Sequence, residues 1–238
     1  MIGSNPFATR FTRPGLLPAL DAAGRPLGMA GLVRRLARCR QAAIVGPHGS
    51  GKSTVLAHLL AELRRQGVVV RWMRLRSFRD LPTLLVAMAS SGQETTLGVD
   101  SWECLGPMAG WLVRGLALVR GCRLVVTSHR AGAFPVLVEC RPSPAVLESL
   151  VCRLPAADGW LGRIIQSADL ESAFALHGGD IREALFDLYD RFEARRPRRS
   201  RSGYAGRDRR SECAVSETGI HESDDDFFQA CMQVRNLG

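Results

Sequence analysis

Apolar residues follow two spacings along the first part of the chain. Short apolar runs, which are typical of strands buried in a sheet, cover residues 41–45, 68–75, 95–99, 123–127 and 136–140. Between these runs apolar residues recur every three or four positions, which predicts helices over residues 28–38, 52–65, 81–90 and 106–120. Because strands and helices alternate, we expect an α/β fold in which helices cover both faces of a parallel sheet.

The pattern changes after residue 141. Further helices are predicted, with no strand between them, over residues 144–153, 160–166, 170–176 and 181–193. From residue 195 the helical spacing stops, and arginines and then aspartates follow, a composition that predicts disorder. We therefore divide the chain into an irregular N-terminal linker (1–27), an α/β core (28–141), a small helical subdomain (142–194) and a disordered tail (195–238).

A glycine-rich segment joins the first predicted strand to the helix that follows it. The segment is Gly46-Pro47-His48-Gly49-Ser50-Gly51-Lys52-Ser53-Thr54, which matches the Walker A pattern in its required strand-to-helix context. Glycines let backbone N–H groups point at phosphate oxygens, and the helix N-terminus adds partial positive charge. Lys52, the only lysine in the chain, is expected to bridge the β- and γ-phosphates of ATP. Ser53 is expected to bind Mg²⁺, and His48 to face solvent.

Two carboxylates follow the third predicted strand. Asp100 ends that strand, where a Walker B carboxylate holds Mg²⁺ through a water molecule. Glu103 is the best available group to orient or deprotonate an attacking water. The alternatives are that Asp100 caps the following turn and that Glu103 is an exposed loop acid or a residue at a helix start.

The last predicted helix begins with Gly178-Gly179-Asp180-Ile181-Arg182. Asp180 is a favourable N-cap residue, and Ile181 begins the apolar face of the helix. Arg182 lies off that face, close to the helix start, where a cation opposes the helix dipole. We therefore expect Arg182 to serve another purpose than stabilising this helix.

The order of these motifs resembles that of the AAA+ ATPases and the related STAND class, both in the ASCE division of P-loop NTPases. The resemblance covers residues 5–194 and implies that the helical subdomain is a lid whose Arg182 reaches the γ-phosphate. It also implies that strand 123–127 lies between the two motif-bearing strands and places Thr127 or Ser128 near that phosphate. Asp100-Ser101-Trp102-Glu103 departs from the adjacent Asp-Glu pair usual in AAA+ members and looks like the STAND variants.

Composition adds limits on location and partners. The net charge is +9, and eight arginines between Arg195 and Arg210 predict weak, sequence-independent nucleic-acid binding by the tail. The 7 cysteines lack CxxC spacing, so we expect reduced thiols without a zinc site. No apolar run is long enough to cross a bilayer and no secretory signal is visible, so a cytoplasmic location without membrane contact is expected.

The leading hypothesis is an ATP-binding and ATP-hydrolysing switch, with Mg²⁺ as cofactor, that acts through a protein partner or as a homo-oligomer. Arg120 and Arg130 are candidates for an arginine finger by position only. A small-molecule or nucleotide kinase is the first alternative, in which four arginines in and just after the second strand would serve as the arginine-rich lid of such enzymes: Arg71, Arg74, Arg76 and Arg79. A nucleic-acid-associated ATP-binding module that uses the arginine tail is the second alternative.

Overall fold

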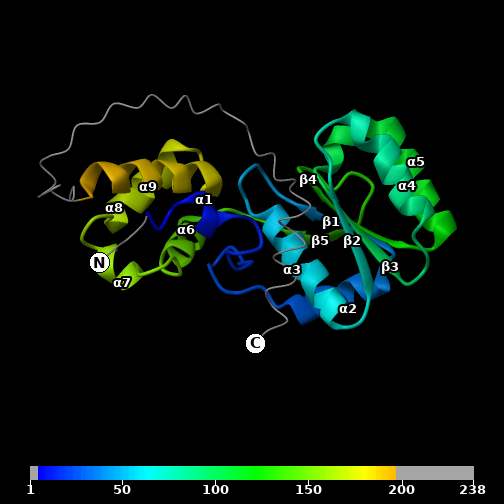
Figure 1. The fold of residues 1–238 in the computed structure, drawn as a ribbon, viewed down its shortest axis with the longest axis horizontal. Coiled ribbons are helices and arrows are strands. Elements are labelled where there is room, and N and C mark those ends of the chain that lie inside the picture. The colour runs from blue at the N-terminus through cyan, green and yellow to red at the C-terminus, as the bar shows by residue number, and fades with distance from the viewer. Residues whose placement is uncertain (1–4, 197–238) are drawn as a thin grey trace, which may run out of the picture.

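The computed structural model describes residues 5–196, so the predicted tail beyond Arg196 lies outside the described residues. Within residues 5–196 the chain forms a five-stranded parallel sheet of order β2-β3-β4-β1-β5 (Figure 1). The strands are β1 (Gln41–Val45), β2 (Val69–Arg74), β3 (Thr95–Asp100), β4 (Arg123–Ser128) and β5 (Val136–Glu139). Each predicted strand is present to within one residue at either end. The α/β fold class with a parallel sheet is confirmed.

The strand order determines what meets at one edge of the sheet. Strand β4 lies between β1 and β3, as the ASCE resemblance implies. In the parallel register Val45 pairs with Ser128, and Val99 pairs with Val126. The carboxyl ends of β1, β3 and β4 therefore lie side by side, and ligands of open α/β sheets bind at such an edge.

Helices cover both faces of the sheet. One face carries α2 (Met29–Arg38) and α3 (Lys52–Arg65), and the other carries α4 (Leu81–Ala89) and α5 (Gly106–Arg120). Side chains of β1 alternate between the two cores: Ala42 and Ile44 pack towards α3, whereas Ala43 and Val45 pack towards α5. Because both faces are buried, the strand is a continuous apolar run rather than an alternating one.

The remaining helices form a separate cluster on one side of the sheet (Figure 1). They are α1 (Thr9–Thr12), α6 (Pro144–Val151), α7 (Ala157–Trp160), α8 (Ser167–Leu176) and α9 (Ile181–Arg195). Arg195, which we expected in the tail, is the last residue of α9, and its side chain bonds to Asp169 of α8. The boundaries of the predicted domains themselves stay a prediction.

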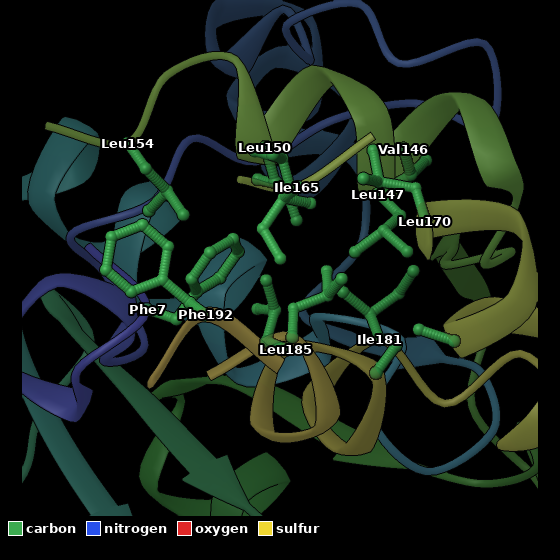
Figure 2. Close-up of a cluster of buried hydrophobic side chains, with 14 of the residues drawn as sticks. Phe7, Val146, Leu147, Leu150, Leu154, Ile165, Leu170, Ile181, Leu185 and Phe192 are labelled. Atoms are coloured by element: carbon green, nitrogen blue, oxygen red, sulfur yellow. The ribbon is translucent and has the colours of Figure 1, made fainter. Parts of the chain in front are cut away.

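The core of this helical cluster includes a residue from the N-terminal segment. Phe7 is 1% exposed and packs edge-on against Trp160 and Phe192, with ring centroids 5.1 and 6.1 Å away. Figure 2 shows Phe7 and Phe192 beside side chains of α6 such as Leu150. Asn5 adds a hydrogen bond of 3.1 Å from its side-chain amide to the carbonyl of Tyr189 on α9. The N-terminal segment is thus attached to the helical cluster.

The helix predicted over residues 160–166 is wrong. Helix α7 ends at Trp160, and the chain then turns so that the Gly162 N–H donates to the carbonyl of Ile165 at 2.7 Å. Trp160 and Ile165 are both fully buried, but a loop brings Ile165 inward. The sequence predicts a helix here because buried loop residues at short spacing give the same apolar pattern as one face of a helix.

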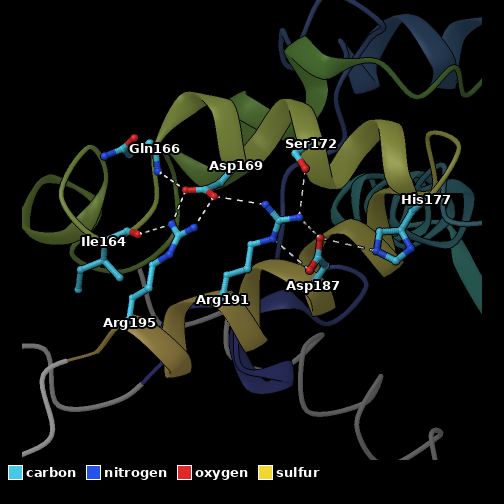
Figure 3. Close-up of polar contacts among 8 residues, drawn as sticks. All are labelled: Ile164, Gln166, Asp169, Ser172, His177, Asp187, Arg191 and Arg195. Atoms are coloured by element: carbon cyan, nitrogen blue, oxygen red, sulfur yellow. Dashed lines mark hydrogen bonds and ion pairs between the residues drawn. The ribbon is translucent and has the colours of Figure 1, made fainter.

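A polar network joins α8 to α9 (Figure 3). The carboxylate of Asp169, 8% exposed, accepts hydrogen bonds from Arg195 at 2.5 and 2.8 Å and from Arg191 at 3.2 Å. It also accepts from the backbone N–H of Gln166 at 2.9 Å. The Arg195 guanidinium, the Gln166 N–H and Arg191 together hold the pKa of Asp169 well below its ordinary value.

Among the described residues, no helix has the length and apolar character needed to cross a membrane.

Candidate functional site

The loop between β1 and α3 curls around the first turn of α3. Gly51 has φ +86°, a left-handed conformation that glycine adopts without steric strain, and it directly precedes Lys52. The Lys52 ammonium folds back over the loop and donates to the carbonyls of Gly46 and Pro47 at 2.8 and 2.6 Å. Ser50 Oγ also donates to the Pro47 carbonyl, at 2.8 Å. The loop therefore encloses the cation at the amino end of a long helix.

The predicted Walker B residue meets the predicted Mg²⁺ ligand. Ser53 Oγ donates to Asp100 Oδ1 and Oδ2 at 2.9 and 2.8 Å, and Asp100 is 2% exposed. Thr127 Oγ1 donates to Asp100 Oδ1 at 2.5 Å and accepts from the Ser101 N–H at 2.9 Å. Residues from α3, β3 and β4 thus converge on one buried carboxylate.

A recess opens beside this carboxylate and contains Glu103. It has a volume of about 700 Å³ and is lined by His48, Arg74, Leu75, Arg76, Ser101, Glu103, Cys104 and His129. Glu103 lies on the 3-10 helix η2 (Trp102–Leu105), and its Oε1 is 3.1 Å from Nε2 of His129. The His129 ring in turn lies against the ring of His48, which is exposed as predicted, with centroids 4.1 Å apart.

Sequence reasoning missed His129, and it named Arg74 only for the kinase alternative, not as a neighbour of Asp100. His129 directly follows β4, and its contact with Glu103 becomes visible only when β4 is placed beside β3. Arg74 ends β2 and brings its Nε to 3.8 Å from Asp100 Oδ2, because β2 pairs with β3 so that Arg74 lies opposite Asp100. Strand order, and no local sequence signal, would have identified these two contacts.

Helix α9 contacts the loop between β1 and α3 through its N-cap residue. Asp180 Oδ1 accepts from the N–H groups of Arg182 and Glu183 at 2.9 and 3.1 Å, which confirms the predicted cap. The same oxygen lies so close to Gly49 that a Cβ built on Gly49 would be 1.8 Å from it. The start of α9 therefore rests directly on the loop.

Charged side chains around Lys52 affect the pKa of its ammonium group. Burial lowers the pKa of Lys52 from its ordinary value, and the charge of Arg182 works in the same direction. Glu103 and Asp100 oppose this shift. Burial raises the pKa of Cys140, a thiol behind the loop, to about 11. Arg182, Glu103 and Asp100 are thus within electrostatic reach of the same ammonium.

Several arginines singled out from the sequence are engaged elsewhere. Arg71 donates to Ala87 O and to Ser90, and Arg120 donates to Ala89 O at 2.5 Å. These contacts attach β2 and α5 to the end of α4, away from the recess. Arg120 is thus committed to its own chain, whereas Arg130 is exposed after β4.

Comparisons with known proteins identify no family. No family model matches the chain, and no curated protein matches it. Among solved structures, the chain is similar to a mutant of RuvB from Thermotoga maritima, with 18% identity and a TM-score of 0.45. The match covers 68% of this chain and 58% of that chain, so the present chain spans less than two thirds of the length of the RuvB mutant. What the site does is therefore inferred from its own geometry.

Proposed function

We propose that the chain binds ATP and Mg²⁺ at residues 46–54 and hydrolyses ATP as a switch that acts through a protein partner. The observation that carries this proposal is the bonding of the Ser53 hydroxyl to both oxygens of Asp100, at 2.9 and 2.8 Å. A hydroxyl at the start of a P-loop helix beside a strand-end carboxylate is the arrangement that holds Mg²⁺ in such NTPases.

The residues present fit both ligands. Serine and carboxylate oxygens are the hard donors that Mg²⁺ prefers, and Lys52 presents an ammonium beside them. The helix N-terminus after Gly51 favours an anion. Mg²⁺ bound by Ser53 and Asp100 would neutralise charge on the β- and γ-phosphate oxygens. Thr127, bonded to Asp100, would keep that carboxylate oriented.

Glu103 is the group that we propose to orient the attacking water. It lies in the recess beside Asp100 and is held by His129, which would limit the directions that its carboxylate can take. Glu103 lies three residues after Asp100, which is the STAND-like spacing and not the adjacent Asp-Glu pair usual in AAA+ members. The finer assignment to an AAA+/STAND-like switch rests on this spacing and on the order of the motifs.

The switch itself is assigned to α9. Its N-cap Asp180 touches Gly49 of the loop, and Arg182 is two residues further along, in the first turn of the same helix. A γ-phosphate near Lys52 would attract Arg182, because charge-assisted hydrogen bonds are roughly twice as strong as neutral ones. The helical subdomain, acting as a lid, would then respond to ATP and not to ADP.

Calorimetric titration of the full chain with ATP, with and without Mg²⁺, tests the site. Lys52→Ala should abolish tight ATP binding, and Asp100→Asn should weaken binding only when Mg²⁺ is present. Asp190→Asn, which neutralises an exposed carboxylate on α9, is the matched control and should bind as the unaltered protein does. Unchanged ATP affinity in Lys52→Ala would remove the site assignment.

A small-molecule kinase is the second candidate, and the recess favours it. Arg74 and Arg76 line the recess beside Glu103, where an anionic acceptor would face the phosphates. The two functions differ in their products. A hydrolase releases inorganic phosphate and ADP in equal amounts, whereas a kinase releases ADP and transfers the phosphoryl group to an added acceptor. Nucleic-acid binding by the tail stays a prediction, because its arginines beyond Arg196 lie outside the described residues.

A further inference from the structure

Three side chains from three different segments meet in the recess. His48 comes from the loop between β1 and α3, His129 directly follows β4, and Glu103 lies on η2. The rings of the two histidines have centroids 4.1 Å apart and are tilted by 51°. Nε2 of His129 lies 3.1 Å from Oε1 of Glu103. The three side chains therefore form a row from the loop to the carboxylate, with His129 in the middle.

The backbone that carries Glu103 is held in place by its neighbours. Ser101 has φ +63° and ψ +51°, a left-handed conformation that is unfavourable for residues other than glycine, and its N–H donates to Thr127 Oγ1 at 2.9 Å. Strained backbone persists only where the surrounding structure requires it, and it is concentrated at functional sites. The ring of Trp102 meets that of Phe134 edge-on, with centroids 5.1 Å apart. A strained turn and an aromatic contact thus fix the start of η2.

The side chain of Glu103 depends on His129 for its direction. It is 37% exposed, and within residues 5–196 its contact with His129 is the one hydrogen bond or ion pair that it makes. A glutamate without a partner samples many rotamers. A group that orients an attacking water must lie within hydrogen-bond reach of that water, and an error of about 1 Å in such geometry can cost about 10²-fold in rate. The contact with His129 therefore decides where the carboxylate points.

The direction selected by this contact brings the carboxylate near Lys52. Burial lowers the pKa of Lys52, and among the charged groups that oppose this shift Glu103 has the largest effect, ahead of Asp100. Because the interaction of two charges falls with distance, the carboxylate of Glu103 lies close to the Lys52 ammonium. Lys52 is the residue that we expect to hold the β- and γ-phosphates. Glu103 is thus held beside the place where the attacked phosphate would lie.

We propose that His129 is the positioning residue for Glu103 and that His48 fixes the ring of His129, so that the direction of Glu103 depends on the loop between β1 and α3. This role rests on the proposed function, because it requires Glu103 to orient the attacking water. Both histidines act through Glu103 and not on the nucleotide itself. Because His48 belongs to the loop, a change in the loop on nucleotide binding is passed to Glu103 through the two rings.

The contact requires a proton on Nε2 of His129. With that proton His129 donates to Oε1 of Glu103, whereas a lone pair on Nε2 would repel the carboxylate. A glutamine side chain can present an N–H group about as far from its backbone as Nε2 of a histidine. A phenylalanine keeps an aromatic ring against His48 and removes the donor. The substitutions His129→Gln and His129→Phe therefore separate the hydrogen bond from the shape of the ring.

Single-turnover hydrolysis of ATP by the full chain with Mg²⁺ is the first test. His129→Phe should slow the chemical step about 10–100-fold, which is part of the 10²–10⁴-fold effect of a general base, and should leave ATP affinity unchanged. His129→Gln should keep most of the rate. His177→Phe is the matched control, because His177 is also half-buried and its Nε2 lies 3.8 Å from Oδ2 of Asp187. It should hydrolyse ATP as the unaltered protein does.

Double variants test the order of the row. In a Glu103→Gln background, His129→Phe should cause no further loss of rate, because the group that it positions has already been removed. His48→Ala should slow the chemical step less than His129→Phe does, because it loosens the ring of His129 without removing the hydrogen bond. In the His129→Phe background, His48→Ala should add no further loss. Circular dichroism of each variant verifies that it is folded.

NMR of the full chain with isotope-labelled histidine detects the contact without any turnover. The signal of His129, assigned by its absence from His129→Gln, should show a proton on Nε2. Glu103→Gln should shift this signal and leave the signals of His58 and His177 in place. A His129 signal that is unchanged in Glu103→Gln would refute the contact itself.

The kinetic outcomes separate this inference from the proposed function. If Glu103→Gln slows hydrolysis and His129→Phe does not, His129 has no positioning role and the proposed function stands. If the losses of Glu103→Gln and His129→Phe multiply in the double variant, His129 acts independently of Glu103 and the inference is overturned. A full chain that binds ATP without hydrolysing it would remove the hydrolytic part of the proposed function, and the role of His129 would fall with it.

Discussion

A methyl group added to Gly49 should separate α9 from the loop between β1 and α3, residues 46–51. The Cβ of Gly49→Ala would lie 1.8 Å from Oδ1 and 2.3 Å from Cγ of Asp180, distances at which atoms cannot coexist. Either the loop or the first turn of α9 must move. Gly49 also has φ +63°, a conformation in which alanine is strained.

The magnitude follows from two contributions. The backbone conformation costs roughly 1–2 kcal/mol for a residue other than glycine. Displacing Asp180 weakens the bonds that it accepts from Arg182 and Glu183, and loss of such a cap costs about 1 kcal/mol. Gly49→Ala should therefore lower the free energy of unfolding by about 2–3 kcal/mol. Gly51→Ala should lose only the backbone part, because Gly51 has φ +86° and its Cβ would meet nothing within 4 Å.

Urea unfolding of a double-mutant cycle measures the contact. In an Asp180→Ala background, Gly49→Ala should cost no more than Gly51→Ala, because the shortened side chain no longer reaches the loop. The difference between the two backgrounds is the coupling of α9 to the loop. If Gly49→Ala and Gly51→Ala lower the free energy of unfolding equally in the otherwise unaltered protein, Asp180 does not contact Gly49. The start of α9 would then not lie on the loop between β1 and α3.

Four further predictions concern single groups. Asp169→Asn should lower the free energy of unfolding by about 1–2 kcal/mol at pH 7, a value that allows for solvent screening at the partly exposed Arg195. Because the folded pKa of Asp169 is depressed, this stabilisation is present above about pH 4 and is lost as the pH falls towards the folded pKa. The difference in free energy of unfolding between the variant and the unaltered protein, measured by urea unfolding, should therefore shrink in acid. Cys140, buried and with a pKa of about 11, should resist alkylation by iodoacetamide at pH 8 in the folded protein, whereas exposed Cys152 should react; mass spectrometry of tryptic peptides reads out both. Arg182→Ala should reduce the ratio of ATP to ADP affinity more than it reduces ADP affinity, and equal ratios in calorimetry would return Arg182 to an exposed first-turn residue. Glu103→Gln should slow single-turnover hydrolysis about 10²–10⁴-fold with ATP affinity retained, and an unchanged rate would exclude Glu103 as the catalytic group.

The strands and the helices around the sheet could be predicted because their signals are local. A buried central strand such as β1 is apolar throughout, and α3 repeats its apolar residues at helical spacing. The meeting of Ser53 with Asp100 could be anticipated as well, since parallel strands end at one edge of the sheet. These expectations needed no knowledge of distant contacts.

Contacts between distant segments could not be predicted. The pairing of His129 with Glu103 depends on which strands are neighbours, and the sequence around each residue is that of an ordinary polar loop. The helix predicted over residues 160–166 is wrong for the opposite reason, because buried loop residues after Trp160 have the apolar spacing of a helix face. The sequence predicts a capped helix at the start of α9. It does not predict the contact of the cap residue Asp180 with Gly49, because the two residues are far apart along the chain.

The position of Phe7 has a consequence for how the protein is made. A ribosome synthesises Phe7 long before Trp160 and Phe192, the rings that cover it, and the bond from Asn5 to Tyr189 spans 184 residues. The sheet and its helices can assemble while the chain is growing, whereas the helical cluster must wait for α9. Until then Phe7 is exposed to water and to other chains, so this cluster is where a nascent protein would depend most on a chaperone.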